Sequence, residues 1–354
     1  MPKALIAMSG GVDSAVAALL TQRAGYDCIG CTMKLYDNAD DAARERSCCA
    51  LDDAEDARSV AFRLGIPHFV FNYTERFRRE VIGNFVDCYR RGRTPNPCVE
   101  CNRHLKFGAL LERAAEMGCD CVVTGHYARI GERDGRFFLK KGLDPAKDQS
   151  YVLSMLTQEQ LAHIRFPLGE LTKAEVRAIA EAEGFRNAHK SESQDICFVP
   201  DGDYARVIEA LTGEPSKPGN YVNQNGQVIG RHQGLIRYTI GQHRGLGLGT
   251  HERLCVLALD PEKNTVTLGP EAALYKSELT ASGVSWVSGE TPGEPLRCAV
   301  KTRYRQREQA ATAIPTGPDT LRVVFDAPQR AITPGQTVVL YEGDTVLGGG
   351  VIEG

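Results

Sequence analysis

A hexapeptide near the start of the chain, Ser9-Gly10-Gly11-Val12-Asp13-Ser14, most constrains how this protein can fold. An apolar run from Ala4 to Met8 precedes it, and an amphipathic pattern from Val12 to Ala24 follows it. Two glycines between a strand and a helix let the backbone turn sharply and approach an anion, which the first amides of the helix can bind. The sequence therefore predicts a strand, a polyphosphate-binding loop and a helix in that order.

The residue types of this loop narrow its chemistry. It is not the phosphate loop that ends in Gly-Lys-Ser/Thr, because no lysine follows the glycines. Asp13 puts a carboxylate beside the expected anion, which makes chemical sense if Asp13 holds a Mg²⁺ ion that bridges to phosphate. The alternative is a plain glycine turn with a serine at the helix N-cap, and the complete hexapeptide favours the phosphate site.

The rest of the chain divides by its periodicity. Up to about Thr124, short apolar runs alternate with amphipathic stretches, which predicts an α/β domain with a parallel sheet and crossover helices. Further strands are expected at Cys28–Met33, His68–Phe71 and Cys121–Thr124, and further helices at Asp52–Leu64, Thr74–Tyr89 and Leu105–Met117. After about Asp203, glycine, proline and short β-prone runs predict small β-rich modules. We expect domains at 1–203, 204–272 and 273–354.

Composition bears on partners and compartment. The net charge of −3 gives no general attraction to nucleic acid, so RNA binding would depend on local basic patches. One candidate patch is rich in arginine between residues 76 and 93; the other is Lys301–Arg307, whose alternating cations would share one face if the run were a strand. Either could instead be a solvated surface. No apolar run could span a membrane and no secretion signal is visible, so we expect a cytoplasmic protein whose 12 cysteines are not a disulfide framework.

Three cysteines stand out. Cys98 and Cys101 form a C-x-x-C directly after Thr94-Pro95-Asn96-Pro97, so the first thiol leaves a rigid loop. A helix expected to begin near Asn102 would put Cys101 at its N-terminus, where helix amides raise the fraction of nucleophilic thiolate. A zinc half-site or a coincidence is the alternative. Cys197 lies where a polar loop turns apolar, a setting that is typical of a buried structural thiol when taken alone.

The hexapeptide resembles the signature of the N-type, or PP-loop, ATP pyrophosphatases, which split ATP into AMP and pyrophosphate in order to adenylate an oxygen. Over essentially the whole chain, an ordered set of motifs resembles the bacterial tRNA-specific 2-thiouridylases. These motifs are SGGVDS, TPNPCVECN, TGHYAR, KDQSYVLS, SESQDICF, YTIGQHRGLG, TRYRQ and TPGQ. The resemblance implies a PP-loop ATP pyrophosphatase domain of the adenine nucleotide alpha hydrolase type, followed by a small central domain and a C-terminal β-barrel-like domain.

The resemblance also implies a reaction: ATP-dependent adenylation at C2 of the wobble uridine (U34) of tRNA, then sulfur transfer that gives 2-thiouridine, AMP and pyrophosphate. Cys101 resembles the nucleophile and Cys197 the persulfide carrier, which would end as a disulfide. The residues that resemble the ATP site are Ala7, Met8, Ser9, Gly10, Gly11, Val12, Asp13, Ser14, Met33 and Gly125. Those that resemble tRNA contacts are Asn96, Pro97, Cys98, His126, Lys147, Asp148, Gln149, Arg303, Tyr304 and Gln336.

One departure keeps a second route open. Many relatives carry aspartate at the position of Cys98, so this chain has three thiols, Cys98, Cys101 and Cys197, that could hold a [4Fe-4S] cluster with one iron open to sulfide. The two-cysteine persulfide route is preferred because the resemblance supports both of its residues. Another PP-loop ligase or amidase, or an RNA-binding or iron-sulfur regulatory protein, is a further alternative. We expect ATP, Mg²⁺, the tRNA anticodon loop and a sulfur donor (a persulfide relay protein or a cysteine desulfurase) as partners of a monomer that binds no membrane.

Overall fold

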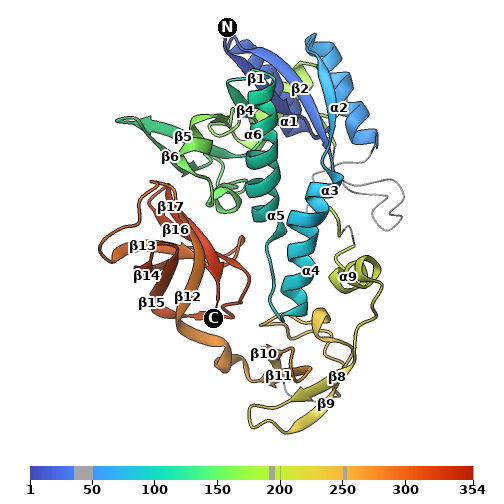
Figure 1. Cartoon of the computed structure of the whole chain (residues 1–354), viewed down its shortest axis with the longest axis vertical. Helices are drawn as coiled ribbons and strands as arrows, with labels where there is room; N and C mark the ends of the chain where they lie inside the picture. The colour runs from blue at the N-terminus through green and yellow to red at the C-terminus, as the bar shows by residue number, and fades with distance from the viewer. Residues whose placement is uncertain (36–50, 191–195, 200, 250–252, 354) are drawn as a thin grey trace.

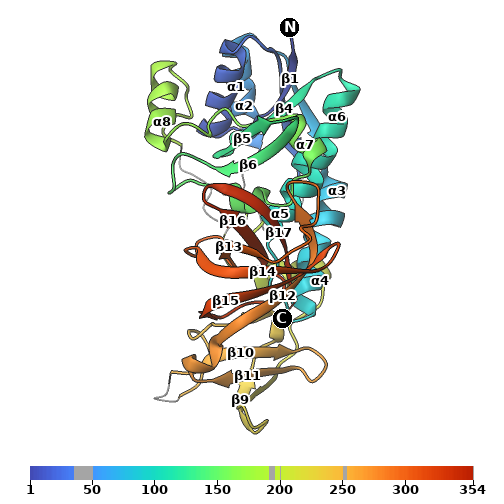
Figure 2. The same ribbon diagram turned by 90° about the vertical axis from the view of Figure 1, so that its left-hand side faces the viewer.

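The computed structural model describes residues 1–35, 51–190, 196–199, 201–249 and 253–353, and three sheets organise them (Figure 1). The first has five strands in the order β3-β2-β1-β4-β7, the second has four in the order β10-β11-β8-β9, and the third has eight in the order β12-β15-β14-β13-β16-β17-β6-β5. Figure 2 shows them one below another, with the C-terminal strands between the other two sheets. The predicted α/β domain followed by β-rich modules is confirmed.

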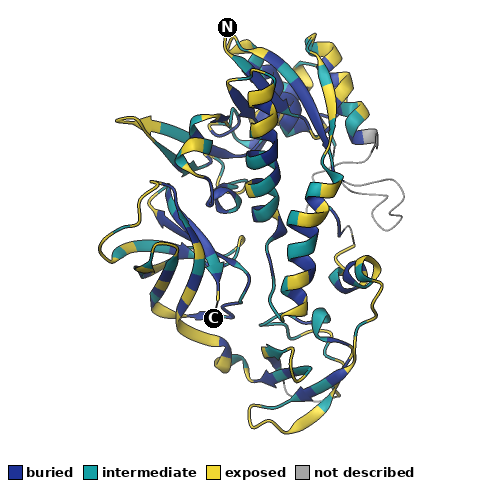
Figure 3. Ribbon diagram, viewed as in Figure 1, coloured by how far each residue is buried: buried dark blue, intermediate teal, exposed yellow. Residues whose placement is uncertain are grey.

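The N-terminal sheet is parallel throughout. Its strands are β1 (Lys3–Ala7), β2 (Asp27–Lys34), β3 (His68–Asn72), β4 (Cys121–Val123) and β7 (Ile164–Arg165). Successive side chains of β1 enter different cores, Ala4 and Ile6 on one face and Leu5 on the other, as the two-residue period of a strand requires. Helices α1 (Val12–Arg23), α2 (Leu51–Leu64) and α8 (Lys173–Ala182) cover the first face. Figure 3 shows that α1 and the central strands are largely buried, whereas α2 presents an exposed outer face.

Two longer helical runs cover the second face, and each contains a π-helical segment. One consists of α3 (Thr74–Phe77), η2 (Arg78–Ile82) and α4 (Gly83–Arg90), close to the predicted Thr74–Tyr89. The other consists of α5 (Pro97–Glu100), η3 (Cys101–Ala109) and α6 (Leu110–Glu116). The predicted helix start near Asn102 is therefore wrong. The helix begins at Pro97, because proline fits the first helical position, where its missing N–H is not needed.

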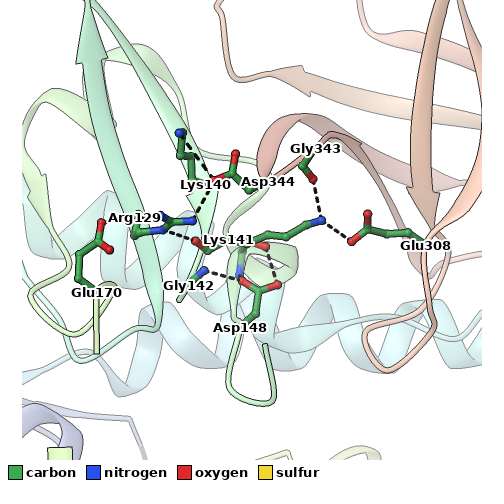
Figure 4. A network of polar contacts seen from close by, with 10 residues as sticks. Arg129, Lys140, Lys141, Gly142, Asp148, Glu170, Glu308, Gly343 and Asp344 are labelled. Atoms are coloured by element: carbon green, nitrogen blue, oxygen red, sulfur yellow. Dashed lines mark hydrogen bonds and ion pairs between the residues drawn. The ribbon is translucent and has the colours of Figure 1, made fainter. Parts of the chain in front are cut away.

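A hairpin from the N-terminal half extends the third sheet. It consists of β5 (Ala128–Arg133) and β6 (Arg136–Lys141), and β6 pairs antiparallel with β17. Figure 4 shows the polar contacts at this junction, where Lys141 is ion-paired with Glu308 at 2.5 Å and Arg129 with Asp344 at 2.9 Å. The short elements that follow are η4 (Ser150–Leu153), α7 (Gln158–Ala162) and, beyond α8, α9 (Tyr204–Thr212).

Of the two β-rich parts, the central one is an open sheet and the C-terminal one is a closed barrel. The central sheet is mixed and contains β8 (Gly219–Val222), β9 (Val228–His232), β10 (Cys255–Asp260) and β11 (Thr265–Gly269), with η5 (Leu235–Arg237) beside it. After η6 (Glu271–Leu274), the C-terminal strands are β12 (Tyr275–Trp286), β13 (Leu296–Lys301), β14 (Gln309–Gly317), β15 (Thr320–Arg330), β16 (Thr337–Glu342) and β17 (Thr345–Ile352). They close into a barrel because β12 pairs with both β15 and β17. None of the helices in the described ranges has the length and apolarity needed to cross a bilayer.

Candidate active site

The glycine loop joins β1 to α1 and is held from several sides. Gly10 has φ of 76°, and a Cβ there would lie 2.3 Å from the carbonyl oxygen of Asp53, so both conformation and space require glycine. The Ser14 hydroxyl donates to the Gly11 carbonyl at 2.9 Å and accepts the amide of Ser9 at 3.1 Å. Asn187 donates to the Gly10 carbonyl at 2.9 Å. With its carbonyls bound in this way, the loop leads into first-turn amides of α1 that have no intrahelical acceptor and can bind an anion.

Asp13 in that first turn is ion-paired. The Nζ atom of Lys173 lies 2.7 Å and 2.8 Å from its two carboxylate oxygens, and the Tyr127 hydroxyl donates to Oδ1 at 2.8 Å. Lys173 is only 8% exposed and is the first residue of α8. Its backbone amide donates to Asp144 at 3.0 Å. Sequence reasoning missed Lys173. The T-x-x-E capping box, Thr172 to Glu175, could have predicted the start of α8 but not that it meets Asp13.

The other residues that were expected to bind ATP surround the same loop. Gly125 follows β4, and a Cβ added to it would lie 2.8 Å from the carbonyl carbon of Asp13 and 2.9 Å from the amide nitrogen of Ser14. Met8 and Met33 are almost fully buried in the two cores that flank the sheet, and Thr32 donates to the Met8 carbonyl at 2.8 Å. The two methionine side chains therefore pack inside the protein.

The C-x-x-C segment is placed differently from the expectation. Because the helix begins at Pro97, the exposed Cys98 lies in its first turn. Cys101 opens the π-helical segment, and its own amide already donates to the carbonyl of Pro97. The influence of helix amides on a thiol fades beyond the first turn, so the predicted activation of Cys101 by the helix N-terminus is wrong.

Cys101 and Cys197 share one core. Both are half-buried and pack against the cluster that contains Leu5 of β1, Phe77 and Phe198. Residues 191–195 of the SESQDICF motif lie outside the described residues, and Cys197 directly follows the point where description resumes. The chain therefore brings the two predicted sulfur-handling thiols to the face of the sheet opposite α1 and α8.

The predicted iron-sulfur ligand set is not assembled in this structure. Within the described ranges, which include Cys98, Cys101 and Cys197, no three His, Cys, Asp or Glu side chains are grouped so that they could hold a metal ion. Cys98 is exposed and lies near Tyr304 of the C-terminal part, whereas the other two thiols pack against the core. Burial, together with Asp148 and Cys98, raises the pKa of the Tyr304 hydroxyl.

The remaining strand thiols are structural. Cys28, Cys31 and Cys121 are buried in the parallel sheet, and burial raises the pKa of the Cys28 thiol to about 11. Thiols held protonated in this way are poor nucleophiles. They pack as small apolar side chains.

The C-terminal barrel holds the loop that precedes Cys98. The Gln336 side-chain amide donates to the carbonyls of Thr94 at 2.9 Å and Pro95 at 3.2 Å, and the Thr94 amide donates to the Pro334 carbonyl at 2.9 Å. Pro97 is buried and Asn96 half-buried beside them. Gln336, which was expected to contact tRNA, therefore contacts the cysteine loop in this structure.

Several other expected tRNA contacts are engaged inside the protein. His126 is 7% exposed between the rings of Phe107 and Phe166, and its Nδ1 lies 2.6 Å from the Thr124 hydroxyl. Burial holds the pKa of His126 well below its usual value. The Gln149 side chain accepts the Tyr127 amide at 3.0 Å. A direct RNA contact by His126 would need this region to open.

Asp148 and Tyr304 lie at the junction between the two halves of the chain. Asp148 accepts the Gly142 amide at 3.1 Å (Figure 4). It also accepts the Ser150 amide at 3.1 Å, and its carbonyl accepts the Tyr304 hydroxyl at 3.1 Å. Lys147 next to it is half-buried. Tyr304 is still 40% exposed and, with Cys98, presents surface to solvent. The exposed members of the expected set therefore lie beside the cysteine loop.

The Lys301–Arg307 run is not a strand. β13 ends at Lys301, and the following residues turn because the Gln306 side chain accepts both the amide and the hydroxyl of Thr302. The four cations therefore do not share one strand face. Arg303 points inward and donates to the carbonyls of Ile240 and Ala331, and burial lowers its pKa.

The arginine-rich segment between residues 76 and 93 is largely ion-paired. The pairs are Arg76–Glu112, Arg79–Glu80, Arg90–Glu214 and Arg93–Glu353, at 2.7 to 2.9 Å. Such pairing reduces the net positive charge that the segment presents to RNA. It agrees better with the solvated-surface interpretation than with a dedicated phosphate-binding patch.

Comparisons with known proteins identify relatives along the whole chain. Three family models match: the tRNA methyl transferase HUP domain at residues 2–201, the tRNA methyl transferase PRC-barrel domain at 211–270 and the aminomethyltransferase beta-barrel domain at 276–352. The tRNA-specific 2-thiouridylase MnmA of Symbiobacterium thermophilum is 51% identical over 99% of this chain and 92% of its own length. Proteins of the same description from Acetivibrio thermocellus and Clostridioides difficile are each 47% identical over 99% of this chain, and over 99% and 98% of their own lengths.

Proposed function

The chain belongs to the family of tRNA-specific 2-thiouridylases, and we propose that its phosphate loop, Cys101 and Cys197 carry out the two halves of that reaction. The observation that carries the conclusion is the 51% identity to a 2-thiouridylase over 99% of the chain. The protein is accordingly an ATP-using sulfurtransferase that thiolates tRNA. The comparisons do not favour a PP-loop ligase or amidase.

The first half-reaction uses the loop between β1 and α1. In our proposal the C2 oxygen of the wobble uridine attacks the α-phosphate of ATP, pyrophosphate leaves, and the base carries AMP on that oxygen. Gly10 and Gly11 allow the backbone to approach the phosphates, and the first amides of α1 donate to them. The C2 oxygen is a poor leaving group by itself, and adenylation lets it depart as part of AMP.

Asp13 fits a magnesium ion that arrives with ATP. Mg²⁺ is commonly held in proteins by one or two carboxylates together with substrate phosphates and water. Asp13 lies in the first turn beside the loop, and one third of its side chain is exposed. When bound, Mg²⁺ would neutralise phosphate charge. The chain's own part is to orient the carboxylate, through Tyr127 and Lys173.

The second half-reaction uses the two thiols. The terminal sulfur of a Cys197 persulfide attacks C2, and AMP departs. The Cys101 thiolate then attacks the Cys197 sulfur of the resulting C2–S–S–Cys197 bridge, which releases the thiocarbonyl and leaves a Cys101–Cys197 disulfide. A dithiol reductant restores both thiols. The packing of both cysteines against one core supports this sequence, because the last step needs the two sulfurs to meet.

Binding of tRNA is proposed at the exposed surface around the cysteine loop. The wobble base must leave its stack to reach this loop, as with other enzymes that modify bases. Tyr304 and Cys98 are the exposed members of the expected contact set there. We further propose a monomer that acts in the cytoplasm and receives its sulfur from a persulfide relay protein or a cysteine desulfurase.

A direct experiment combines two readouts. Purified protein, Mg-ATP and an unmodified tRNA transcript should release pyrophosphate, and the release should stop when position 34 of the transcript is cytidine. With a persulfide donor and dithiothreitol, nucleoside mass spectrometry should then detect 2-thiouridine. Equal pyrophosphate release with either transcript, or with none, would contradict the proposal, and activity in an iron-free preparation would exclude the cluster route.

A further inference from the structure

The residue that follows Cys197 is an aromatic side chain buried in the core. Phe198 is 5% exposed and Val199 is fully buried, whereas Cys197 itself is only half-buried. The Val199 amide donates to the Ile196 carbonyl at 2.8 Å, so residues 196–199 form a turn. This turn directs two apolar side chains inward and leaves part of Cys197 accessible.

Phe198 belongs to a cluster of aromatic rings that is centred on the helical run α3, η2 and α4. Its ring centroid lies 5.8 Å from that of Phe77 and 5.0 Å from that of Phe85, with the ring planes 80° and 85° apart. These are edge-to-face contacts, an arrangement that aromatic rings favour. Phe85 also contacts Tyr89, at 4.9 Å between centroids, and Tyr204, at 6.1 Å. The cluster therefore attaches the chain around Cys197 to the helices on the second face of the sheet.

The proposed chemistry makes a positional demand on Cys197. Its sulfur must receive a sulfur atom from the donor, attack C2 and then be attacked by Cys101, so the thiol needs both access and a defined place. A displacement of about 1 Å at a reacting group can slow a reaction about 100-fold. Cys197 lies in a turn and not in a helix or strand, so side chains next to it have to hold it in place.

From these contacts we infer that Phe198 is a positioning residue for Cys197. Its ring, in edge-to-face contact with Phe77 and Phe85, fixes the turn so that the Cys197 thiol stays at the core that Cys101 also contacts. The inference rests on the proposed role of Cys197 as the sulfur carrier. Because adenylation does not use Cys197, loss of the Phe198 ring should affect sulfur transfer and not pyrophosphate release.

The first test compares Phe198→Ala with the matched control Phe325→Ala. Both phenylalanines are 5% exposed, but Phe325 lies in the core of the C-terminal barrel, which contains neither Cys101 nor Cys197. In single-turnover assays with persulfide-loaded protein, Phe198→Ala should form 2-thiouridine at least about tenfold more slowly and keep tRNA-dependent pyrophosphate release. Phe325→Ala should keep both rates. Equal rates of thiolation in the two variants would overturn the inference.

Accessibility of the thiol gives a second readout that needs neither tRNA nor ATP. Labelling of the full chain with iodoacetamide, followed by mass spectrometry of its peptides, measures the rate at Cys197 relative to the exposed Cys98. Because Phe198 holds a half-buried thiol against the core, Phe198→Ala should raise this ratio severalfold, and Phe325→Ala should leave it unchanged. If the ratio in Phe198→Ala equals that of wild type, the ring does not hold Cys197.

Milder substitutions keep the inference testable if Phe198→Ala fails to fold. Phe198→Leu and Phe85→Leu retain apolar bulk, and each removes one side of the same ring contact. Each should raise the labelling ratio of Cys197, and the double variant should raise it by less than the product of the two single effects, because both changes disrupt one contact. Single effects that simply multiply would count against the inference.

Failure of the proposed function would be a separate result. It would appear as Cys197→Ser protein that still forms 2-thiouridine, whereas the labelling ratios would still decide whether Phe198 positions Cys197.

Discussion

Replacement of Gly125 by alanine tests whether the phosphate loop depends on close backbone packing between β4 and α1. The added methyl carbon would lie 2.8 Å from the carbonyl carbon of Asp13, 2.9 Å from the amide nitrogen of Ser14 and 3.0 Å from the Asp13 Cβ. Because ordinary carbon contacts are near 3.5 Å, the end of β4 and the start of α1 must separate by roughly half an ångström. All three contacts are with backbone or Cβ atoms, so no flexible side chain can relieve the clash.

The cost follows from that displacement. Overpacking of a close-packed site lowers the free energy of unfolding by about 1–3 kcal/mol. For a domain of 150–250 residues, each kcal/mol lowers the melting temperature by about 2–4 °C, so Gly125→Ala should lower it by about 2–12 °C. Binding of Mg-ATP should also weaken, because Asp13 and the first amides of α1 are the groups displaced.

The measurements are thermal unfolding by circular dichroism and calorimetric binding of Mg-ATP. Gly293→Ala is the matched control: it adds the same methyl group at a loop position with nothing within 4 Å of the new carbon. We expect the control to melt and bind like wild type. If Gly125→Ala behaves like Gly293→Ala in both measurements, the packing argument for the loop is wrong.

Three further predictions concern sulfur transfer, the cysteine loop and pH. Cys197→Ser should keep tRNA-dependent pyrophosphate release but form no 2-thiouridine by mass spectrometry. The control Cys298→Ser should keep pyrophosphate release and 2-thiouridine formation. Loss of pyrophosphate release in Cys197→Ser would contradict the order of steps. Gln336→Ala removes two hydrogen bonds to the cysteine loop, each worth about 1 kcal/mol. Single-turnover thiolation should therefore slow while Mg-ATP binding stays unchanged. An undiminished rate of thiolation would refute this. Burial lowers the pKa of His126, so below about pH 6.5 the unfolded chain binds a proton that the folded chain does not. Denaturant titrations should therefore show that the free energy of unfolding decreases as the pH is lowered, by up to about 1.4 kcal/mol per pH unit from this group. The same pH dependence in His126→Asn would count against this.

Elements with strong local signals could be predicted from the sequence. The expected helices Val12–Ala24 and Asp52–Leu64 match α1 and α2 to within one residue at each end. α2 packs a periodic apolar face on the sheet, whereas α1 is buried around most of its circumference. The sequence pattern places the start of the helix that contains Cys98 and Cys101 too late, because Pro95 and Pro97 suggest a rigid loop although proline is also favoured at the first helical position. The domain boundaries at 203 and 272 stay predictions.

Contacts between distant segments could not be predicted in this way. The addition of the β5–β6 hairpin to the C-terminal sheet depends on the pairing of Leu139 with Val346, and neither strand carries a local sign of its partner. The same holds for Asp13 and Lys173, which lie 160 positions apart. A sequence motif identified the loop and its carboxylate, but the ammonium that faces the carboxylate is fixed only by the packing of α8 against α1.

The position of the helix start changes how the two thiols of the C-x-x-C must be understood. Cys98 occupies the first turn, where helix amides favour a thiolate, but it is exposed and stands apart from the core that Cys101 and Cys197 share. Cys101 gains little from the helix, because its amide already donates to Pro97. Its proposed task is to attack a sulfur bridge on Cys197, and this step depends on access to that sulfur as well as on thiolate character. Since both thiols pack against one cluster beneath β1, the fold contributes chiefly by placing Cys101 and Cys197 on the same side of the sheet whose β1 strand leads into the phosphate loop.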